Sequence, residues 1–262
     1  MLSVTSGQLA AWVASFLWPF VRMLALVSTA PILSDPAVPR QVKVALAAIL
    51  AVVLAPALGA AAAVPPVSAA GVWILVQQVL IGVAMGFSMR LVFAAVQAAG
   101  EYIGLQMGLS FASLIDPSSG GQSTVVARLL SLLAMLIFLA VDGHLQLIAA
   151  LAHSFETLPV GAAPLAAGGW LLVARSGGEI FVIGLMLALP LVTALLTLNL
   201  AMGILNRASP QFSIFAVGFP LTLLAGTAML YLLMPQLPAF LRPQFEAAIE
   251  LVTRLPRALA GS

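Results

Sequence analysis

Cysteine is absent from the 262 residues of this sequence. A chain without cysteine has no disulfide bonds, no thiolate ligands for metal ions and no cysteine nucleophile. The absence does not by itself identify the compartment in which the protein works.

Charged side chains are almost as scarce. Only 7% of the residues are charged, 63% are hydrophobic, and the mean hydropathy is +1.17. Too few polar residues remain to cover a soluble globule of this size, so a soluble protein is excluded. The net charge of +2 comes from ten basic and eight acidic residues. The sequence has no cluster of basic residues of the kind that binds nucleic acid.

Long runs without any charge dominate the chain. They are long enough for the roughly 20-residue apolar helices that span a bilayer, and they cover residues 1–21, 44–89, 180–206 and 208–241. We therefore predict an all-α, polytopic membrane protein built of kinked helical hairpins. The first hairpin covers residues 44–89, with its tip at Pro65 and Pro66, and the second joins residues 180–205 to 213–234.

Basic residues give a weak indication of orientation. The positive-inside rule predicts a cytoplasmic location for the side of the membrane that carries Arg22, Arg40, Lys43, Arg90, Arg128 and Arg207.

The middle of the chain, from residue 90 to 108, is less apolar than its flanks. If it is helical, Arg90, Gln97 and Glu101 share one face, because they are spaced by seven and four residues. Gly100, Gly104 and Gly108 would make a stripe of small residues, which predicts close contact with another helix. The alternative is an ordinary solvated loop that carries charge between spans.

An isolated arginine follows the apolar run 180–206. Asn199, Gly203 and Asn206 share one face of the incoming helix, which suits a protein neighbour better than lipid. Arg207 then lies at the apex of the hairpin, where it either contacts a partner or simply anchors a turn on the cytoplasmic side.

Catalytic and metal-binding patterns are missing. We find no Ser–Lys or Ser–His pair, no His-Glu-x-x-His and no glycine-rich phosphate loop. His144 and His153 are nine residues apart and do not share a helical face as metal ligands would. Local hydrogen bonds or an interface role are the expected use of these histidines, and a proton relay is the alternative. The sequence predicts a protein that is no enzyme and has no cofactor or metal.

The end of the chain is amphipathic. Phe245, Ile249 and Val252 fall on one helical face, and Glu250 can pair with Arg254 one turn later. We predict a helix that lies on the membrane surface or on a partner.

Two long motifs of mixed chemistry carry a family resemblance. The stretch "ALPLVTALLTLNLAMGILNRASPQFSIFAVGFPLTLLAG" resembles the hallmark segment of the FliR/SctT family, the flagellar biosynthetic proteins of the bacterial type III export gate. The stretches "GEYIGLQMGLSFASLIDPSSG" and "RLLSLLAMLIFLAVDGHLQLI" resemble the central region of that family, and the likeness runs from about Arg22 to Arg242.

The resemblance implies a core subunit of a helical, multi-subunit gate in the bacterial inner membrane, at the flagellar basal body. Its implied partners are FliP and FliQ, with FlhB and FlhA, and unfolded flagellar proteins would pass through the closed pore. It also implies a FliP-like region at residues 1–178 and a FliQ-like hairpin with the amphipathic tail at residues 179–262.

The resemblance further implies a plug loop near residues 108–121, and an ordinary interface loop is the alternative. Hydrophobic constriction is an established means of closing a pore to ions. The implied plug residues are Leu109, Ser110, Phe111, Leu114, Ile115, Asp116 and Pro117. The expected interface or motif residues are Gly100, Glu101, Gly104, Asn199, Asn206, Arg207, Pro210, Gln211, Phe215, Gly218, Phe219 and Pro220.

Two other functions stay open at this point. The equivalent subunit of a virulence injectisome would have a closely similar sequence. A secondary transporter or ion channel would instead use buried polar residues as a substrate site, and the candidates are Gln77, Gln78, Asn199 and Asn206.

Overall fold

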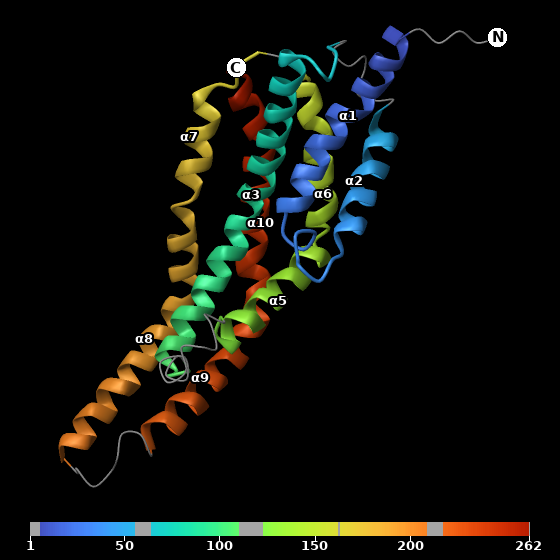
Figure 1. The fold of residues 1–262 in the computed structure, drawn as a ribbon. Coiled ribbons are helices and arrows are strands. Elements are labelled where there is room, and N and C mark those ends of the chain that lie inside the picture. The colour runs from blue at the N-terminus through green and yellow to red at the C-terminus, as the bar shows by residue number, and fades with distance from the viewer. Residues whose placement is uncertain (1–5, 56–63, 110–122, 162, 209–216, 262) are drawn as a thin grey trace. The chain divides into compact units, whose positions relative to one another are not determined.

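Helices make up every regular element in the described part of the chain (Figure 1). This computed structural model describes residues 6–55, 64–109, 123–161, 163–208 and 217–261, with side chains from residue 13 onward. The elements are α1 (Ser6–Thr29), α2 (Arg40–Leu54), α3 (Ala69–Gln106), α5 (Val125–Ala140), α6 (Gly143–Thr157), α7 (Ala167–Ser176), α8 (Glu179–Ala208), α9 (Phe219–Leu233), the 3-10 turn η4 (Met234–Gln236) and α10 (Leu237–Ala260).

Several of these helices have the length and composition of membrane spans. Among the described residues, three stretches qualify, namely Ala69–Gln106, Ala167–Ala208 and Phe219–Ala260, and a fourth span is present if α5 and α6 are counted together. The predictions of an all-α fold and of a polytopic membrane protein are confirmed.

The chain divides into two compact units that are each built from separate stretches of sequence. Unit 1 contains Met1–Leu91, Asp142–Gly177 and Phe245–Ser262, and unit 2 contains Val92–Val141 and Gly178–Gln244. One border therefore falls beside the predicted boundary at residue 178, while α3 and α10 contribute to both units. The functional division into residues 1–178 and 179–262 stays a prediction.

Small residues bring α1 and α3 together within unit 1. A side chain added at Gly82 would meet the backbone oxygen of Arg22, and one added at Gly86 would meet Thr29. Such close approach lets the two helices share many van der Waals contacts, which is how helices associate when lipid removes the hydrophobic driving force. Figure 1 shows α2 running alongside α1, and α2 buries only Ala47 and Ala51.

The helix α3 does not end where the uncharged run ends. The run stops at Met89, but the helix continues through Arg90 to Gln106. Arg90 and Gln97 are exposed and Glu101 is half-buried, so the predicted shared face is present and the loop alternative is wrong. At about 1.5 Å per residue, these 38 residues form a helix about 57 Å long, nearly twice the hydrocarbon core of a bilayer.

The amphipathic tail forms α10, and its Arg254 guanidinium pairs with the Glu250 carboxylate as predicted. Its apolar face is covered by this chain, because Val252, Leu255 and Leu259 are fully buried. The prediction that this face rests on the membrane surface or on a partner is therefore wrong. Apolar spacing predicts a buried face without specifying what buries it.

Unit 2 packs the second part of α3 against α5 and α8. The Phe93 and Phe138 rings meet edge to face, with centroids 5.6 Å apart and an interplanar angle of 82°. A side chain at Gly184 of α8 would come within 2.9 Å of the Ala95 backbone oxygen. The first part of α3 thus packs against α1 within unit 1, and its second part packs against α5 and α8 within unit 2.

Candidate functional site

The predicted plug residues mostly lie outside the described part of the chain. Ser110, Phe111, Leu114, Ile115, Asp116 and Pro117 belong to the segment 110–122, of which nothing is described. Leu109 is half-buried and stands at the start of that segment.

A glycine ends α3 just before this segment. Gly108 has a φ of 81°, in the left-handed region that L side chains rarely adopt. Its N–H donates to the Leu105 oxygen at 3.1 Å, and the Leu109 N–H donates to the Gly104 oxygen at 3.0 Å. This pair of hydrogen bonds is the Schellman arrangement, which satisfies the last carbonyls of a helix and turns the chain away.

The same end of α3 holds the start of α5. The Thr124 N–H donates to Glu101 Oε1 at 3.0 Å, and the Thr124 hydroxyl donates to the Gly100 oxygen at 3.2 Å. Thr124 also caps α5, since its hydroxyl oxygen accepts from the Ala127 N–H at 3.2 Å. The Glu101 carboxylate thus sits at the positive end of the α5 dipole, where a negative charge is stabilised.

Glycines make this contact possible. A side chain at Gly100 would meet the backbone of Ala127, and one at Gly104 would meet the Thr124 side chain. The predicted close contact is confirmed at Gly100 and Gly104, and the helix that they contact is α5 of the same chain. The expectation that Gly108 continues this stripe is wrong, because α3 ends at Gln106. A further role of Gly100, Glu101 and Gly104 at a subunit interface stays a prediction. We call Gly100, Glu101, Gly104 and Thr124 the loop anchor, because they join the two ends of the segment 110–122.

The helix α9 holds the other side of the same junction. The Thr222 hydroxyl donates to the Met107 oxygen at 3.4 Å, and a side chain at Gly226 would lie 2.6 Å from Met107 Cγ. α9 begins at Phe219 with Pro220 in its first turn, a position that tolerates the missing N–H. Gly218 is buried, whereas Phe219 and Pro220 are exposed.

The predicted polar face of α8 is largely open in the described part of the chain. Asn199 is exposed, Asn206 is half-buried, and a side chain at Gly203 would meet no atom within 4 Å. Arg207 is exposed near the end of α8. Pro210, Gln211 and Phe215 lie outside the described residues.

Apolar side chains surround this open face. Large hydrophobic residues are exposed along the whole of α8 and on α9, among them Phe181, Met186, Leu200, Ile204, Leu224 and Leu232. An exposed apolar surface of this extent on helices must be covered by lipid or by another protein.

A second polar site was not predicted from the sequence. Arg22 of α1 is 0% exposed, and its guanidinium reaches both α3 and α6. Nε donates to Gln78 Oε1 at 2.7 Å, Nη1 donates to the Ser154 backbone and hydroxyl oxygens at 3.1 Å, and Nη2 donates to the Leu158 oxygen at 3.0 Å. Arg22 lies within α1, and the cytoplasmic side that the positive-inside rule assigns to it stays a prediction.

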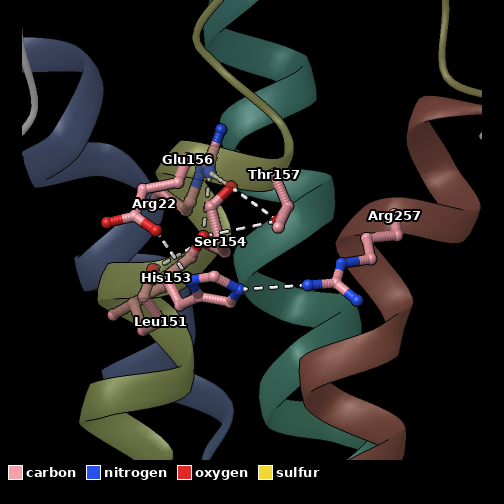
Figure 2. Close-up of polar contacts among 7 residues, drawn as sticks. All are labelled: Arg22, Leu151, His153, Ser154, Glu156, Thr157 and Arg257. Carbon is pink, nitrogen blue, oxygen red and sulfur yellow. Dashed lines mark hydrogen bonds and ion pairs between the residues drawn. The ribbon is translucent and has the colours of Figure 1, made fainter.

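The end of α6 compensates the charge of this buried guanidinium. Ser154 supplies its carbonyl from the last turn of α6 (Figure 2). Leu158 supplies the carbonyl of the C-cap, and the helix dipole is negative at this end. The Phe155 ring lies 4.1 Å from Arg22 Cζ and adds a cation–π contact. A lone arginine in an apolar segment, together with two glutamines in another, was the sequence signal for this site.

The two histidines occupy different surroundings. His153 Nδ1 lies 2.8 Å from Glu156 Oε2, and Arg257 Nη2 lies 3.5 Å from His153 Nε2 (Figure 2). His144 Nδ1 is buried without a hydrogen-bond partner among the described residues. The expected local hydrogen bonds are therefore confirmed for His153. No group of three or more potential metal ligands occurs within the ranges that the structure describes.

The glutamines proposed for a transporter site already have partners inside the chain. Gln77 Nε2 donates to the Ala163 oxygen at 2.6 Å, and Gln78 accepts from Arg22. Both side chains are buried. They stabilise helix packing in unit 1 and are not available to line a substrate site.

Comparison with known proteins agrees with the resemblance seen in the sequence. Residues 13–248 match the sequence pattern described as "Bacterial export proteins, family 1". The flagellar biosynthetic protein FliR of Pectobacterium carotovorum subsp. carotovorum is 50% identical over 262 residues, which is all of both chains. FliR of Escherichia coli (strain K12) is 50% identical over 96% of each chain, and FliR of Bacillus subtilis (strain 168) is 30% identical over 94% of this chain and 96% of its own.

Proposed function

This chain belongs to family 1 of the bacterial export proteins and is a membrane component of a flagellar export apparatus, and from that premise we propose that it is a core subunit of the type III export gate. In this role it forms, with FliP and FliQ, the closed pore through which unfolded flagellar proteins leave the cell. It acts as a structural subunit and not as an enzyme. The gate lies in the inner membrane at the flagellar basal body, next to FlhB and FlhA.

The open surface of α8 is the observation that carries this proposal. Asn199, Gly203 and Asn206 combine amide hydrogen-bonding groups with a glycine that has no neighbour within 4 Å. Lipid tails cannot hydrogen-bond to amides, whereas an adjacent helix can do so and can also approach the glycine closely. Arg207 at the end of this helix would contact a partner subunit or the cytoplasmic part of the apparatus. Pro210, Gln211 and Phe215 continue the same motif.

The alternatives have less support. Two of the four residues proposed for a transporter site, Gln77 and Gln78, already bond to Ala163 and Arg22. The other two, Asn199 and Asn206, lie on the open face of α8. The three relatives described above carry flagellar names, which favours flagellar use over a virulence injectisome.

Copurification tests the proposal directly. We expect the tagged chain, expressed together with FliP and FliQ of the same bacterium, to elute with both in one large complex. Gly203→Leu should reduce the recovered FliP and FliQ, because the bulky side chain blocks close approach, whereas Val53→Leu on exposed α2 is the matched control. A chain that is monodisperse alone, fails to retain either protein and moves a small solute would contradict the gate.

We further propose that residues 108–121 plug the pore, with Leu109, Phe111, Leu114 and Ile115 excluding water. The loop anchor supports this proposal, because it fixes where both ends of the loop begin on α3 and α5. Two hydrogen bonds and two close glycine contacts thus hold the base of this loop.

Deleting residues 110–116 is expected to open the pore to ions. Cells producing the deletion variant should grow more slowly and lose membrane potential, as measured with a voltage-sensitive dye. A control deletion of the same length at residues 56–62, in the connection after α2, should leave the membrane tight. Normal growth, a tight membrane and normal export after the 110–116 deletion would exclude the plug.

A further inference from the structure

A histidine joins the ends of two helices of unit 1. His153, in the last two turns of α6, lies between Glu156 of the same helix and Arg257 of α10, which is 104 residues away in sequence (Figure 2). Nδ1 of the ring lies 2.8 Å from Glu156 Oε2, and Nε2 lies 3.5 Å from Arg257 Nη2. The His153 side chain is 40% exposed, so water and protons reach the ring. We call these three residues the histidine contact.

The two partners determine where the hydrogen of the imidazole lies. A carboxylate has only acceptors, so Nδ1 must carry the hydrogen that points to Glu156. A guanidinium has only donors, so Nε2 must present its lone pair to Arg257. Only the neutral ring with its hydrogen on Nδ1 satisfies both neighbours. The histidine contact therefore joins α6 to α10 in one protonation state of the ring.

A second proton on the ring would reverse the interaction with α10. Imidazole side chains commonly change charge between about pH 5 and 8. The added hydrogen occupies the Nε2 lone pair, so the ring can no longer accept from Arg257, and two cations then lie 3.5 Å apart. The Glu156 carboxylate offsets part of the new charge, but it lies on the Nδ1 side and restores no acceptor for the guanidinium. Protonation thus weakens the link to α10 and leaves the link to Glu156 in place.

The helices packed against α6 carry further charges, namely Arg22 on α1, and Glu250 and Arg254 on the face of α10 that carries Arg257. Arg22 bonds to Ser154, the residue after His153, and Glu250 pairs with Arg254. α3 contributes the uncharged amide of Gln78 to the Arg22 site. Arginines and carboxylates in general keep their charge over the pH range in which imidazoles titrate. The ring of His153 is therefore the member of this group whose charge changes in that range.

The histidine contact lies close to the attachment of the last turn of α10. Two residues beyond Arg257, the Leu259 oxygen accepts from the Ala166 N–H at 2.8 Å. The Leu259 side chain is fully buried, and a Cβ added at Gly169 would lie 2.5 Å from its Cδ2. Earlier in α10, a buried apolar face holds the helix whatever the pH. A change at His153 should therefore act on the last turn of α10 and on the Ala166 bond, without unfolding unit 1.

From this arrangement we propose that the histidine contact is a pH-sensitive switch, in which neutral His153 holds the last turn of α10 and protonated His153 loosens it. Interactions between exposed charged groups are weak, so acid should increase the opening of this turn only about two- to fivefold. The inference uses contacts within unit 1 alone, and it stands or falls separately from the proposed pore and plug.

Hydrogen exchange at the Ala166 amide measures this opening in the full chain purified in detergent, because the amide exchanges when it leaves the Leu259 oxygen. The exchange rate of the parent is divided by that of His153→Gln at the same pH, which cancels the chemical effect of pH on exchange. Glutamine keeps a polar side chain but gains no charge in acid. We expect this ratio to be about two- to fivefold higher at about pH 5.5 than at about pH 8. A ratio that is the same at both pH values would overturn the proposal.

Substitutions of Arg257 show whether the switch acts through α10. Arg257→Gln removes the cation that the protonated ring repels, so the rise in acid should disappear, whereas Arg257→Lys keeps the cation and should keep the rise. Arg254→Gln is the matched control and should behave like the parent, because Arg254 is an exposed arginine one turn earlier that pairs with Glu250. A rise of the parent's size in Arg257→Gln would refute the switch. The comparison of the parent with His153→Gln decides the question even if Arg257→Gln does not fold.

Discussion

Arg22→Ala is expected to lower the melting temperature of the purified chain and its level in the membrane. The substitution removes every hydrogen bond from the guanidinium to Gln78, Ser154 and Leu158. Buried acceptors left without donors cost about 1–3 kcal/mol each, and the Ser154 backbone oxygen keeps the bond from the Leu158 N–H. The loss of unfolding free energy is therefore on the order of 4 kcal/mol. Thermal unfolding in detergent, followed by circular dichroism, measures the effect.

Arg90→Ala is the matched control for this change, because Arg90 is an exposed arginine on an apolar helix. The melting temperature of Arg22→Lys should lie between those of Arg22→Ala and Arg90→Ala. Lysine keeps the positive charge but replaces the planar fork of guanidinium donors with a single ammonium group, so it cannot serve α3 and α6 together. If Arg22→Ala unfolds at the same temperature as Arg90→Ala, the buried network does not stabilise unit 1.

Two glycine substitutions are expected to change stability in opposite directions. Gly100→Ala places a methyl group against the backbone of Ala127, which cannot move without displacing α5. Overpacking of this kind costs typically about 1–3 kcal/mol. Gly203→Ala meets no atom within 4 Å, and alanine in a helix interior is about 0.5–1 kcal/mol more favourable than glycine.

The melting temperature of the isolated chain should therefore fall for Gly100→Ala and stay level or rise for Gly203→Ala. Thr124→Ala tests the same junction as Gly100→Ala without adding volume, and it should cost about 1 kcal/mol as a lost helix cap. A Gly100→Ala chain as stable as the parent would show that α5 does not need the close approach seen at Ala127.

Helix content and membrane residence follow from the sequence because they depend on composition and on local spacing. The face shared by Arg90, Gln97 and Glu101 is an example. The helical period of 3.6 residues places these side chains on one face, whichever segment packs against the helix. The sequence predicts that the first hairpin ends before Arg90. Arg90 does not interrupt the helix, because an arginine at an exposed position breaks no backbone hydrogen bond.

Contacts between distant segments could not be predicted in the same way. The glycine stripe at Gly100 and Gly104 predicts that some helix approaches closely, and only the folded chain identifies it as α5. The Arg22 site needs the last carbonyls of α6, 132 residues away in sequence for Ser154. Most of the acceptors of Arg22 are backbone oxygens, which any residue could supply. The sequence therefore does not distinguish this buried arginine from one on a connection between membrane helices.

The tail illustrates a further limit of apolar patterns. Phe245 and Val252 lie on one face as expected, but that spacing is the same for a helix on lipid, on a partner or on its own chain. The tertiary contacts of Leu259 with Gly169, and the bond from the Ala166 N–H to the Leu259 oxygen at 2.8 Å, decide among the three.

The interleaved build of unit 1 has a consequence for how the protein is made. A ribosome delivers α1 to α3 first, then α6 and α7, and α10 after all of these. Until α10 emerges, Gly169, the Ala166 amide and His153 lack the neighbours that it supplies. The earlier helices of this unit must therefore wait for α10 before their packing is complete.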